Sequence, residues 1–301
     1  MAVPLEELRR RFRQGPLVLD GAMGTELERR GVCGPLPMWS AEALRTAPAV
    51  VAAIHREYAA AGADILVADT FRTNPRALRA ADCTGDGLAL NRLAVELARA
   101  AGDGGREILV AASVAPVEDC YHPERVPEDA ILRAEHEQMA AWLAAAGPDL
   151  IWIETMNSLR EARSAAQAAH GHGLPLAVSF VVRQTGDLLS GGPLEEAVDA
   201  VEPLDPLAIG LNCIPPRGLT ALLPRLRRAT TRTIAAYAHI DNPRPIAGWD
   251  YAESVSPAAY AEYARRWLDL GASIIGGCCG TTPAHIGAVR TVVATRAQVR
   301  T

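Results

Sequence analysis

Hydrophobic residues along the chain gather in eight short runs, and a longer segment with helical periodicity follows each run. The runs are rich in Val, Ile and Leu and seldom alternate with polar residues, which is typical of parallel strands covered on both faces. The predicted strands are Leu17–Leu19, Ile65–Ala68, Ile108–Val114, Leu150–Ile153, Leu176–Val182, Ala208–Leu211, Thr233–Tyr237 and Ser273–Ile275. The predicted helices are Ala49–Ala61, Leu88–Ala101, Glu128–Ala146, Ser158–Ala169, Leu194–Val201, Leu219–Arg228, Pro257–Leu270 and Pro283–Thr295.

Eight strand–helix units in 301 residues predict a (β/α)8 barrel, built as a single domain over residues 1–301. An open, doubly wound sheet is the alternative. Two long segments follow predicted strands, Ala115–Pro127 after the third and His239–Ser256 after the seventh. Because barrel enzymes place their binding groups on the loops after the strands, we expect these two segments to border the functional site.

The basic residues of the chain are all arginine: the 30 Lys and Arg positions include no lysine. Enzymes that form a Schiff base through a lysine are therefore excluded, and so are pyridoxal-phosphate enzymes that hold their cofactor in this way. A Walker A nucleotide loop is excluded as well, because it requires a lysine.

The formal net charge is −5 and the arginines are scattered, so we expect no nucleic-acid surface. The longest apolar runs, such as Ala140–Ala146, are shorter than a membrane span, and no apolar signal-peptide core follows the charged stretch Leu5–Arg11. The expected location is the cytoplasm, without a membrane partner. In that reducing compartment the six cysteines are expected as thiols or metal ligands rather than disulfides. The oligomeric state stays open, a homo-oligomer included.

The most distinctive segment is Gly276–Pro283, in which Cys278 and Cys279 are adjacent and flanked by glycines. It follows the eighth predicted strand, and Cys213 ends the sixth. In a closed barrel these strand ends lie on the same rim, one strand apart, so the three sulfurs are expected to converge. Three thiolates and an open fourth position are typical of a catalytic zinc site. The simpler alternative for any single cysteine is a small buried core residue.

The remaining cysteines carry weaker signals. Cys33 and Cys83 lie in polar, turn-like stretches and are interpreted as ordinary buried thiols. Cys120 lies in the long segment after the third strand and is a weak candidate for a thiol at the rim.

Two carboxylates stand at predicted strand ends. Asp20 follows the first strand and begins a glycine-containing loop, in which Gly21 and Gly24 let backbone N–H groups approach an anion such as a carboxylate. Glu154 ends the fourth strand, where a buried carboxylate needs a cation or hydrogen-bond donors. An ordinary Asp-Gly turn and a buried Glu–Arg pair are the structural alternatives.

Together these segments resemble the zinc-dependent homocysteine S-methyltransferases. That family includes the S-methylmethionine-using enzymes, betaine–homocysteine methyltransferase and the N-terminal module of cobalamin-dependent methionine synthase. The resemblance covers nearly the whole chain. It is carried by Leu17–Thr25, Gly62–Asp64, Asp69–Phe71, Glu154–Thr155, Ser179–Phe180, Ser190–Gly191, Gly210–Cys213 and Gly276–Pro283.

The resemblance implies a (β/α)8 barrel that transfers a methyl group to the thiol of homocysteine, giving methionine. It implies that Asp20 and Glu154 bind the amino group of the amino acid, while backbone amides hold its carboxylate. The implied Zn²⁺ ligands are Cys213, Cys278 and Cys279. The implied amides are those of the loop that contains Gly21, Ala22 and Met23.

The methyl donor is expected to be a sulfonium, such as S-methylmethionine or S-adenosylmethionine. No cobalamin or folate module follows the predicted eighth helix, which runs almost to the end of the sequence. Three alternatives stay open. The acceptor is another thiol or a selenol; the donor is a folate or corrinoid on a partner protein; or the chain is a zinc-binding barrel subunit without catalysis.

Two segments depart from the family pattern. After the third strand the family often has Gly-Pro followed by Gly, and this chain has Val114–Asp119 there. After the seventh strand the family often has Tyr-Pro-Asn-Ala-Gly, and this chain has Tyr237–Asp241 there. His239 falls where the family has Asn, so it is a candidate fourth zinc ligand in the absence of substrate. A loop histidine bonded to its neighbours is the simpler interpretation. Aromatic residues that could reach the rim and attract a sulfonium are Trp39, Tyr121, Tyr237 and Trp249.

Overall fold

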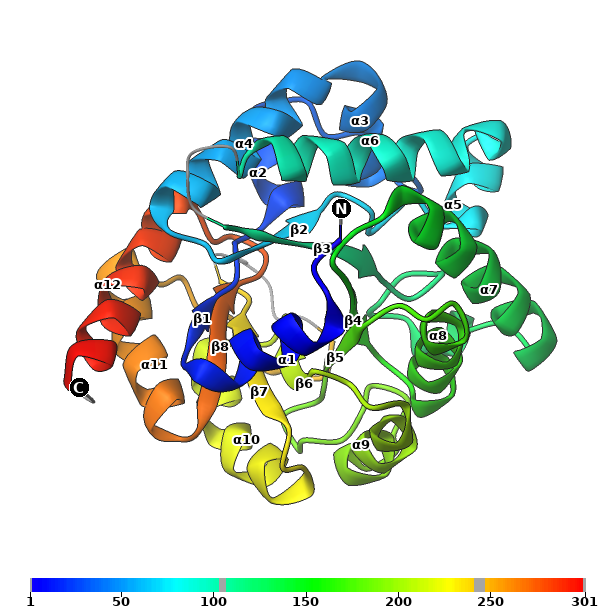
Figure 1. The fold of residues 1–301 in the computed structure, drawn as a ribbon. Helices are drawn as coiled ribbons and strands as arrows, with labels where there is room; N and C mark the ends of the chain where they lie inside the picture. Colours follow the sequence, from blue (N-terminus) through cyan, green and yellow to red (C-terminus); the bar gives the residue numbers. More distant parts are fainter. Residues whose placement is uncertain (1, 103–106, 241–246, 300–301) are drawn as a thin grey trace.

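The computed structural model describes residues 2–102, 107–240 and 247–299. Its eight parallel strands form one sheet in the order β1-β8-β7-β6-β5-β4-β3-β2, surrounded by helices (Figure 1). A parallel bridge between Leu19 and Ile65 joins the first strand to the second, and Asp64 N donates to Val18 O at 2.7 Å beside it. The sheet therefore closes on itself, which confirms the (β/α)8 barrel and makes the open-sheet alternative wrong.

The elements alternate regularly along the chain. The strands are β1 Leu17–Val18, β2 Ile65–Ala68, β3 Leu109–Val114, β4 Leu150–Met156, β5 Leu176–Phe180, β6 Ala208–Asn212, β7 Thr233–Ala238 and β8 Ala272–Gly277. The helices are α1 Leu5–Gln14, α2 Met23–Arg29, α3 Glu42–Thr46, α4 Pro48–Ala61, α5 Pro75–Ala80, α6 Gly87–Ala100, α7 Asp129–Ala146, α8 Leu159–Gly171, α9 Leu194–Val201, α10 Pro216–Ala229, α11 Pro257–Asp269 and α12 Pro283–Val299.

Each predicted strand and crossover helix is present, with ends that differ by a few residues. Proline is the first residue of α4, α11 and α12, where its missing N–H would have had no helical partner in any case. The prediction missed α1, α2, α3 and α5. The last three have seven residues or fewer, which is too short for a clear helical period.

The helix α1 lies across one end of the barrel (Figure 1). Its buried residues Leu8 and Phe12 pack into the same apolar cluster as inward-facing strand residues such as Leu109 and Trp152. This packing explains the amphipathic pattern at the start of the chain. The barrel is thus filled and covered at the N-terminal ends of its strands, and its opening lies at the C-terminal ends, as in other barrels of this kind.

A second and larger apolar cluster lies between the strands and the surrounding helices. It contains side chains such as Ile54 of α4, Leu143 of α7 and Trp267 of α11, each fully buried. The described helices include none with the combination of length and apolar character that a membrane span requires.

Candidate metal and amino-acid site

A cavity of about 580 Å³ opens at the C-terminal ends of the strands. This size lies within the roughly 300–1,000 Å³ that is usual for small-molecule sites. Its walls come from the loops after several strands, including the predicted loop after β3, which contributes Asp119, Cys120 and Tyr121. The described part of the loop after β7 contributes His239 and Ile240. Residues 241–246 of that loop, which include Asp241, lie outside the described residues.

Three cysteines meet at this cavity. The Sγ atoms of Cys213, Cys278 and Cys279 all lie within 4.8 Å of one another, and those of Cys213 and Cys279 are 3.8 Å apart. Within residues 2–102, 107–240 and 247–299, this is the one group of three or more His, Cys, Asp or Glu side chains close enough to share a metal ion. The predicted convergence of the three sulfurs is present, and the group fits a metal.

The backbone around each cysteine explains this convergence. Cys213 follows β6 with φ +55°, a left-handed conformation that redirects its side chain. Gly280 follows Cys279 with φ +85°, which glycine adopts without strain, so the chain turns directly after the cysteine pair. A Cβ at Gly277 would lie 2.2 Å from Thr281 Oγ1, so the strand end needs glycine where Thr281 folds back.

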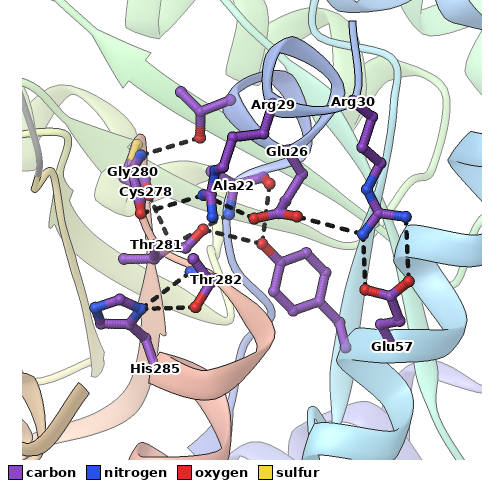
Figure 2. Close-up of polar contacts among 12 residues, drawn as sticks. Ala22, Glu26, Arg29, Arg30, Glu57, Cys278, Gly280, Thr281, Thr282 and His285 are labelled. Carbon is purple, nitrogen blue, oxygen red and sulfur yellow. Dashed lines mark hydrogen bonds and ion pairs between the residues drawn. The ribbon is translucent and has the colours of Figure 1, made fainter. Parts of the chain in front are cut away.

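Thr281 ties the cysteine loop to the loop after β1 (Figure 2). Its fully buried hydroxyl donates to the Cys278 carbonyl at 2.7 Å and accepts from Ala22 N at 3.2 Å. Tyr58 OH donates to the carbonyls of Ala22 and Thr281, at 2.9 and 3.2 Å. The cysteine pair and the predicted carboxylate-binding loop are therefore held in one rigid arrangement.

The short distances between the thiols shift their protonation. Hydrogen bonds from Cys278 and Cys279 hold the pKa of the Cys213 thiol well below its usual value, despite burial. The same contact raises the pKa of Cys278, because it donates to Cys213. Tyr121 OH lies 3.0 Å from Cys213 Sγ, and His239 Nδ1 lies 3.6 Å from it. The cluster therefore stabilises negative charge on sulfur, which is the form that binds metals.

The two predicted carboxylates face the same cavity. Glu154 accepts hydrogen bonds from Ser113 Oγ at 2.6 Å and Tyr237 OH at 3.3 Å, yet its burial raises its pKa to about 7. Asp20 accepts from Val67 N at 2.8 Å, and its pKa is raised well above its usual value by burial and by the charge of Glu154. Two buried carboxylates with raised pKa values form a site that a positively charged group would stabilise.

The glycine loop after Asp20 is only partly available to a ligand. Ala22 N already donates to Thr281 Oγ1, so this amide is engaged within the protein. Gly21, Ala22 and Met23, the predicted carboxylate-binding residues, all line the cavity.

With the site described, comparison with known proteins shows the family of the chain. The sequence model of the homocysteine S-methyltransferase family matches residues 17–293. The chain belongs to this family. The motifs that suggested the resemblance therefore reflect a relationship over nearly the whole barrel.

Relatives of the homocysteine S-methyltransferase family match the chain over most of its length. Homocysteine S-methyltransferase 2 of Arabidopsis thaliana is 29% identical over 91% of this chain and 92% of its own. A selenocysteine methyltransferase of Astragalus bisulcatus is 29% identical over 88% of this chain and 89% of its own. The metallated form of the homocysteine methyltransferase MmuM from Escherichia coli is 30% identical, covers 93% of this chain and 96% of its own, and has a TM-score of 0.80.

The structure also places the aromatic residues and the remaining cysteines that the sequence analysis named. Trp39, Tyr121, Tyr237 and Cys120 line the cavity. Trp249 does not: its indole N–H donates to Val182 O at 2.8 Å and its buried ring packs against the core, so its predicted place at the rim is wrong. Cys33 and Cys83 also pack against the core, as expected of ordinary thiols.

Ser113, Asp69 and Arg72 are among the polar lining residues to which the sequence prediction gave no role. Ser113 is a polar residue within the otherwise apolar strand β3. Asp69 and Arg72 come directly after β2, at the C-terminal end of a barrel strand. That position is the signal that could have found all three, because binding groups of barrel enzymes concentrate there.

Proposed function

We propose that this chain is a zinc-dependent enzyme that transfers a methyl group from a sulfonium donor to the thiol of homocysteine, giving methionine. The observation that carries the proposal is the group of three cysteine sulfurs at one cavity with two buried carboxylates, Asp20 and Glu154. The family of the chain and its likeness to the Escherichia coli homocysteine methyltransferase support the same conclusion.

Cys213, Cys278 and Cys279 would hold the zinc ion. The 3.8 Å between the Sγ atoms of Cys213 and Cys279 is short enough for both sulfurs to bind one zinc ion. A zinc ion held there would supply a lowered pKa to a thiol that joins it, so that the thiolate form would be present at neutral pH.

The carboxylates and the glycine loop would orient the amino acid. Asp20 and Glu154 bind its ammonium group, since one positive charge between them relieves both their mutual repulsion and their burial. The amides of Gly21, Ala22 and Met23 are proposed for its carboxylate, with Ala22 shared with Thr281 Oγ1. Because Thr281 joins this loop to the cysteine pair, an amino acid held there directs its side-chain sulfur toward the cysteines.

The methyl transfer itself needs few groups. The acceptor sulfur forms a bond to the donor methyl carbon, the donor carbon–sulfur bond breaks, and its electron pair stays on the donor sulfur as a neutral thioether. The thiol proton leaves to solvent. Lining carboxylates and the ring of Trp39, which lies 6.2 Å from that of Phe71, favour a cationic donor over its neutral product.

A donor screen with metal analysis tests the proposal. The purified protein is incubated with homocysteine and S-methylmethionine, S-adenosylmethionine, betaine or methyltetrahydrofolate, and methionine is measured together with zinc content on the same sample. We expect about one zinc per chain and methionine formation with a sulfonium. A protein that binds one zinc but methylates no thiol with any donor would favour a non-catalytic barrel subunit.

A selenol acceptor is the second candidate, because relatives with similar identity are selenocysteine methyltransferases. Homocysteine and selenocysteine carry the same ammonium and carboxylate groups, so the residues proposed to bind the amino acid suit both acceptors. Competition between homocysteine and selenocysteine in the same assay decides which acceptor has the higher kcat/KM.

His239 remains a proposed fourth ligand in the absence of amino acid. Its side chain is 8% exposed, and its Nε2 has no hydrogen-bond partner among the described residues. A structure with zinc and without homocysteine tests this role, for which a nitrogen–zinc distance of about 2.0–2.1 Å is required.

A further inference from the structure

Acidic side chains far outnumber basic ones around the cavity. Of the described residues that line it, one is an arginine, Arg72. The acidic residues of the lining are Asp20, Glu28, Asp69, Asp119 and Glu154. Such an acidic cavity suits a cationic donor, and the single guanidinium marks the place where a negative group of a ligand would be stabilised.

Arg72 is buried without a counterion. Its side chain is 7% exposed and its Nη1 donates to the Glu118 carbonyl oxygen at 2.9 Å. Its Nε is buried and finds no hydrogen-bond partner, and no acidic side chain forms an ion pair with it, within the part of the chain that the structure describes. A buried cation in this state is unfavourable unless an anion pairs with it, so the arrangement favours an anionic ligand.

The neighbouring arginine shows that this state is not imposed by the local fold. Arg76, four residues further along the chain, pairs with Glu118 at 3.0 Å and with Glu135 at 2.9 Å. Arg79 pairs with Glu135 as well. Acidic side chains are therefore close by, yet they are used by the two arginines that do not line the cavity.

Arg72 also lies near the reacting end of the cavity. It lines the same cavity as Cys120 and the three cysteines Cys213, Cys278 and Cys279. Its guanidinium carbon is 5.5 Å from the centre of the Phe71 ring, which belongs to the aromatic wall with Trp39. A carboxylate on Arg72 would thus place the rest of a small donor between the aromatic wall and the sulfurs.

We propose that Arg72 binds the carboxylate of the methyl donor and selects donors that carry the onium group and a carboxylate in one small molecule. The inference rests on the proposed function for the nature of the donor. The proposed partners of the amino acid acceptor are different groups, namely Asp20, Glu154 and the glycine loop, so Arg72 is assigned to donor specificity rather than to acceptor binding.

The test compares two donors that differ only in the charge of one group, S-methylmethionine and its amide. In the native protein we expect kcat/KM to be at least about 10-fold higher for the carboxylate donor. Arg72→Met should lower kcat/KM for S-methylmethionine by about 10- to 100-fold, as expected for the loss of a hydrogen-bonded charge pair. The kcat/KM for the amide donor should change by no more than about threefold. For Arg72→Lys, kcat/KM for S-methylmethionine should lie between the values of the native protein and of Arg72→Met, because lysine keeps the charge but lacks the planar guanidinium group.

Arg76→Met provides the matched control. It removes a cation from the same segment, but one that pairs with Glu118 and Glu135 and does not line the cavity. The ratio between the two donors should stay at its native value in this variant, even if the melting temperature falls.

Calorimetric binding of both donors to the zinc-loaded protein, without homocysteine, separates this inference from the proposed function. If no methionine forms but S-methylmethionine binds more tightly than its amide only when Arg72 is present, the role of Arg72 stands and the reaction fails. Equal losses for both donors would show that Arg72 only holds the loop through Glu118 and would overturn the inference. A fall in homocysteine affinity with unchanged donor preference would overturn it as well, by assigning Arg72 to the acceptor.

Discussion

Asp64 and Asp69 flank the same strand, β2, and their carboxylates are paired very differently. Asp64 precedes the strand, where its Oδ2 accepts from Val18 N at 2.8 Å and forms an ion pair with Arg290. Asp69 follows the strand and is 3% exposed, and its Oδ2 has no hydrogen-bond partner among the residues described. Burial raises the pKa of Asp69 to about 6, although Ser40 donates to it.

The strand β4 repeats this contrast. Asp149, just before it, accepts from Val3 N and Val110 N at 2.9 and 2.8 Å. Glu154, near its other end, accepts from two hydroxyl groups among the described residues and has its pKa raised by burial to about 7. Carboxylates at the N-terminal end of the barrel thus stabilise the fold, whereas those at the C-terminal end stay incompletely paired, at a cost in stability that a bound cationic group would offset.

The largest expected effect concerns the cysteines at the C-terminal end. Cys213→Ala or Cys278→Ala should abolish zinc binding and lower methyl transfer roughly 1,000-fold or more, since metal ligands matter more than the groups around them. The melting temperature without metal should change little, because the buried members of the two apolar clusters are other side chains. Metal analysis, activity and circular dichroism on the same samples measure these outcomes.

Cys83→Ala is the control for the cysteine variants. Cys83 is a buried thiol that packs in the core and does not line the cavity, so zinc content and activity should be retained. Unfolding of Cys278→Ala, rather than loss of metal alone, would mean that the metal is structural and that the two ends of the barrel do not differ as argued.

The next effect concerns Glu154. Glu154→Gln keeps the shape of the side chain but removes the charge that is proposed to bind the substrate ammonium group. Homocysteine affinity should fall by about 10- to 100-fold, the range for a lost charged hydrogen bond, with zinc retained. Titration calorimetry with the zinc-loaded variant gives this affinity directly, and an unchanged Kd would remove Glu154 from the proposed site.

The sequence alone predicted the barrel and the cysteine site for physical reasons that are visible in particular residues. Apolar runs such as Ile65–Ala68 need cover on both faces, which only a parallel sheet between helices provides. The ends of β6 and β8 are fixed on one rim by closure, so Cys213 and the cysteine pair had to approach each other.

Other parts of the site depend on contacts between segments that no periodicity records. Thr281 bridges two loops more than 250 residues apart in sequence, and the missing counterion of Arg72 is a property of its surroundings rather than of its own segment. Trp249 was misplaced for the same reason, since a loop aromatic can turn toward the core as easily as toward a cavity. Short helices such as α2 were missed by the sequence prediction, because one or two helical turns are too short to show a periodic pattern of hydrophobic residues.

The pair of aspartates gives the sharpest test of the contrast between the two ends. Asp64→Asn removes an ion pair and should lower the free energy of unfolding by about 1 kcal/mol at pH 8, as expected for a partly exposed pair. Asp69→Asn removes a buried charge and should raise it by up to about 3 kcal/mol, since a pKa shift of about two units corresponds to that energy. Urea denaturation without ligand measures both, and two changes of the same sign would break the comparison.

The smallest effect is the pH dependence of the Asp69 variant. The folded protein binds a proton at Asp69 with a pKa of about 6, above the 3.8 of an unperturbed aspartate, so protonation favours the folded state. The buried charge of Asp69 therefore lowers the free energy of unfolding at high pH, and this loss shrinks as the pH falls through about 6. The advantage of Asp69→Asn over the native protein should shrink from about 3 kcal/mol at pH 8 to roughly half of that at pH 5. If the difference in free energy of unfolding between Asp69→Asn and the native protein is the same at both pH values, the added stability comes from packing. The Asp69 carboxylate would then not be an unpaired charge that a ligand could neutralise.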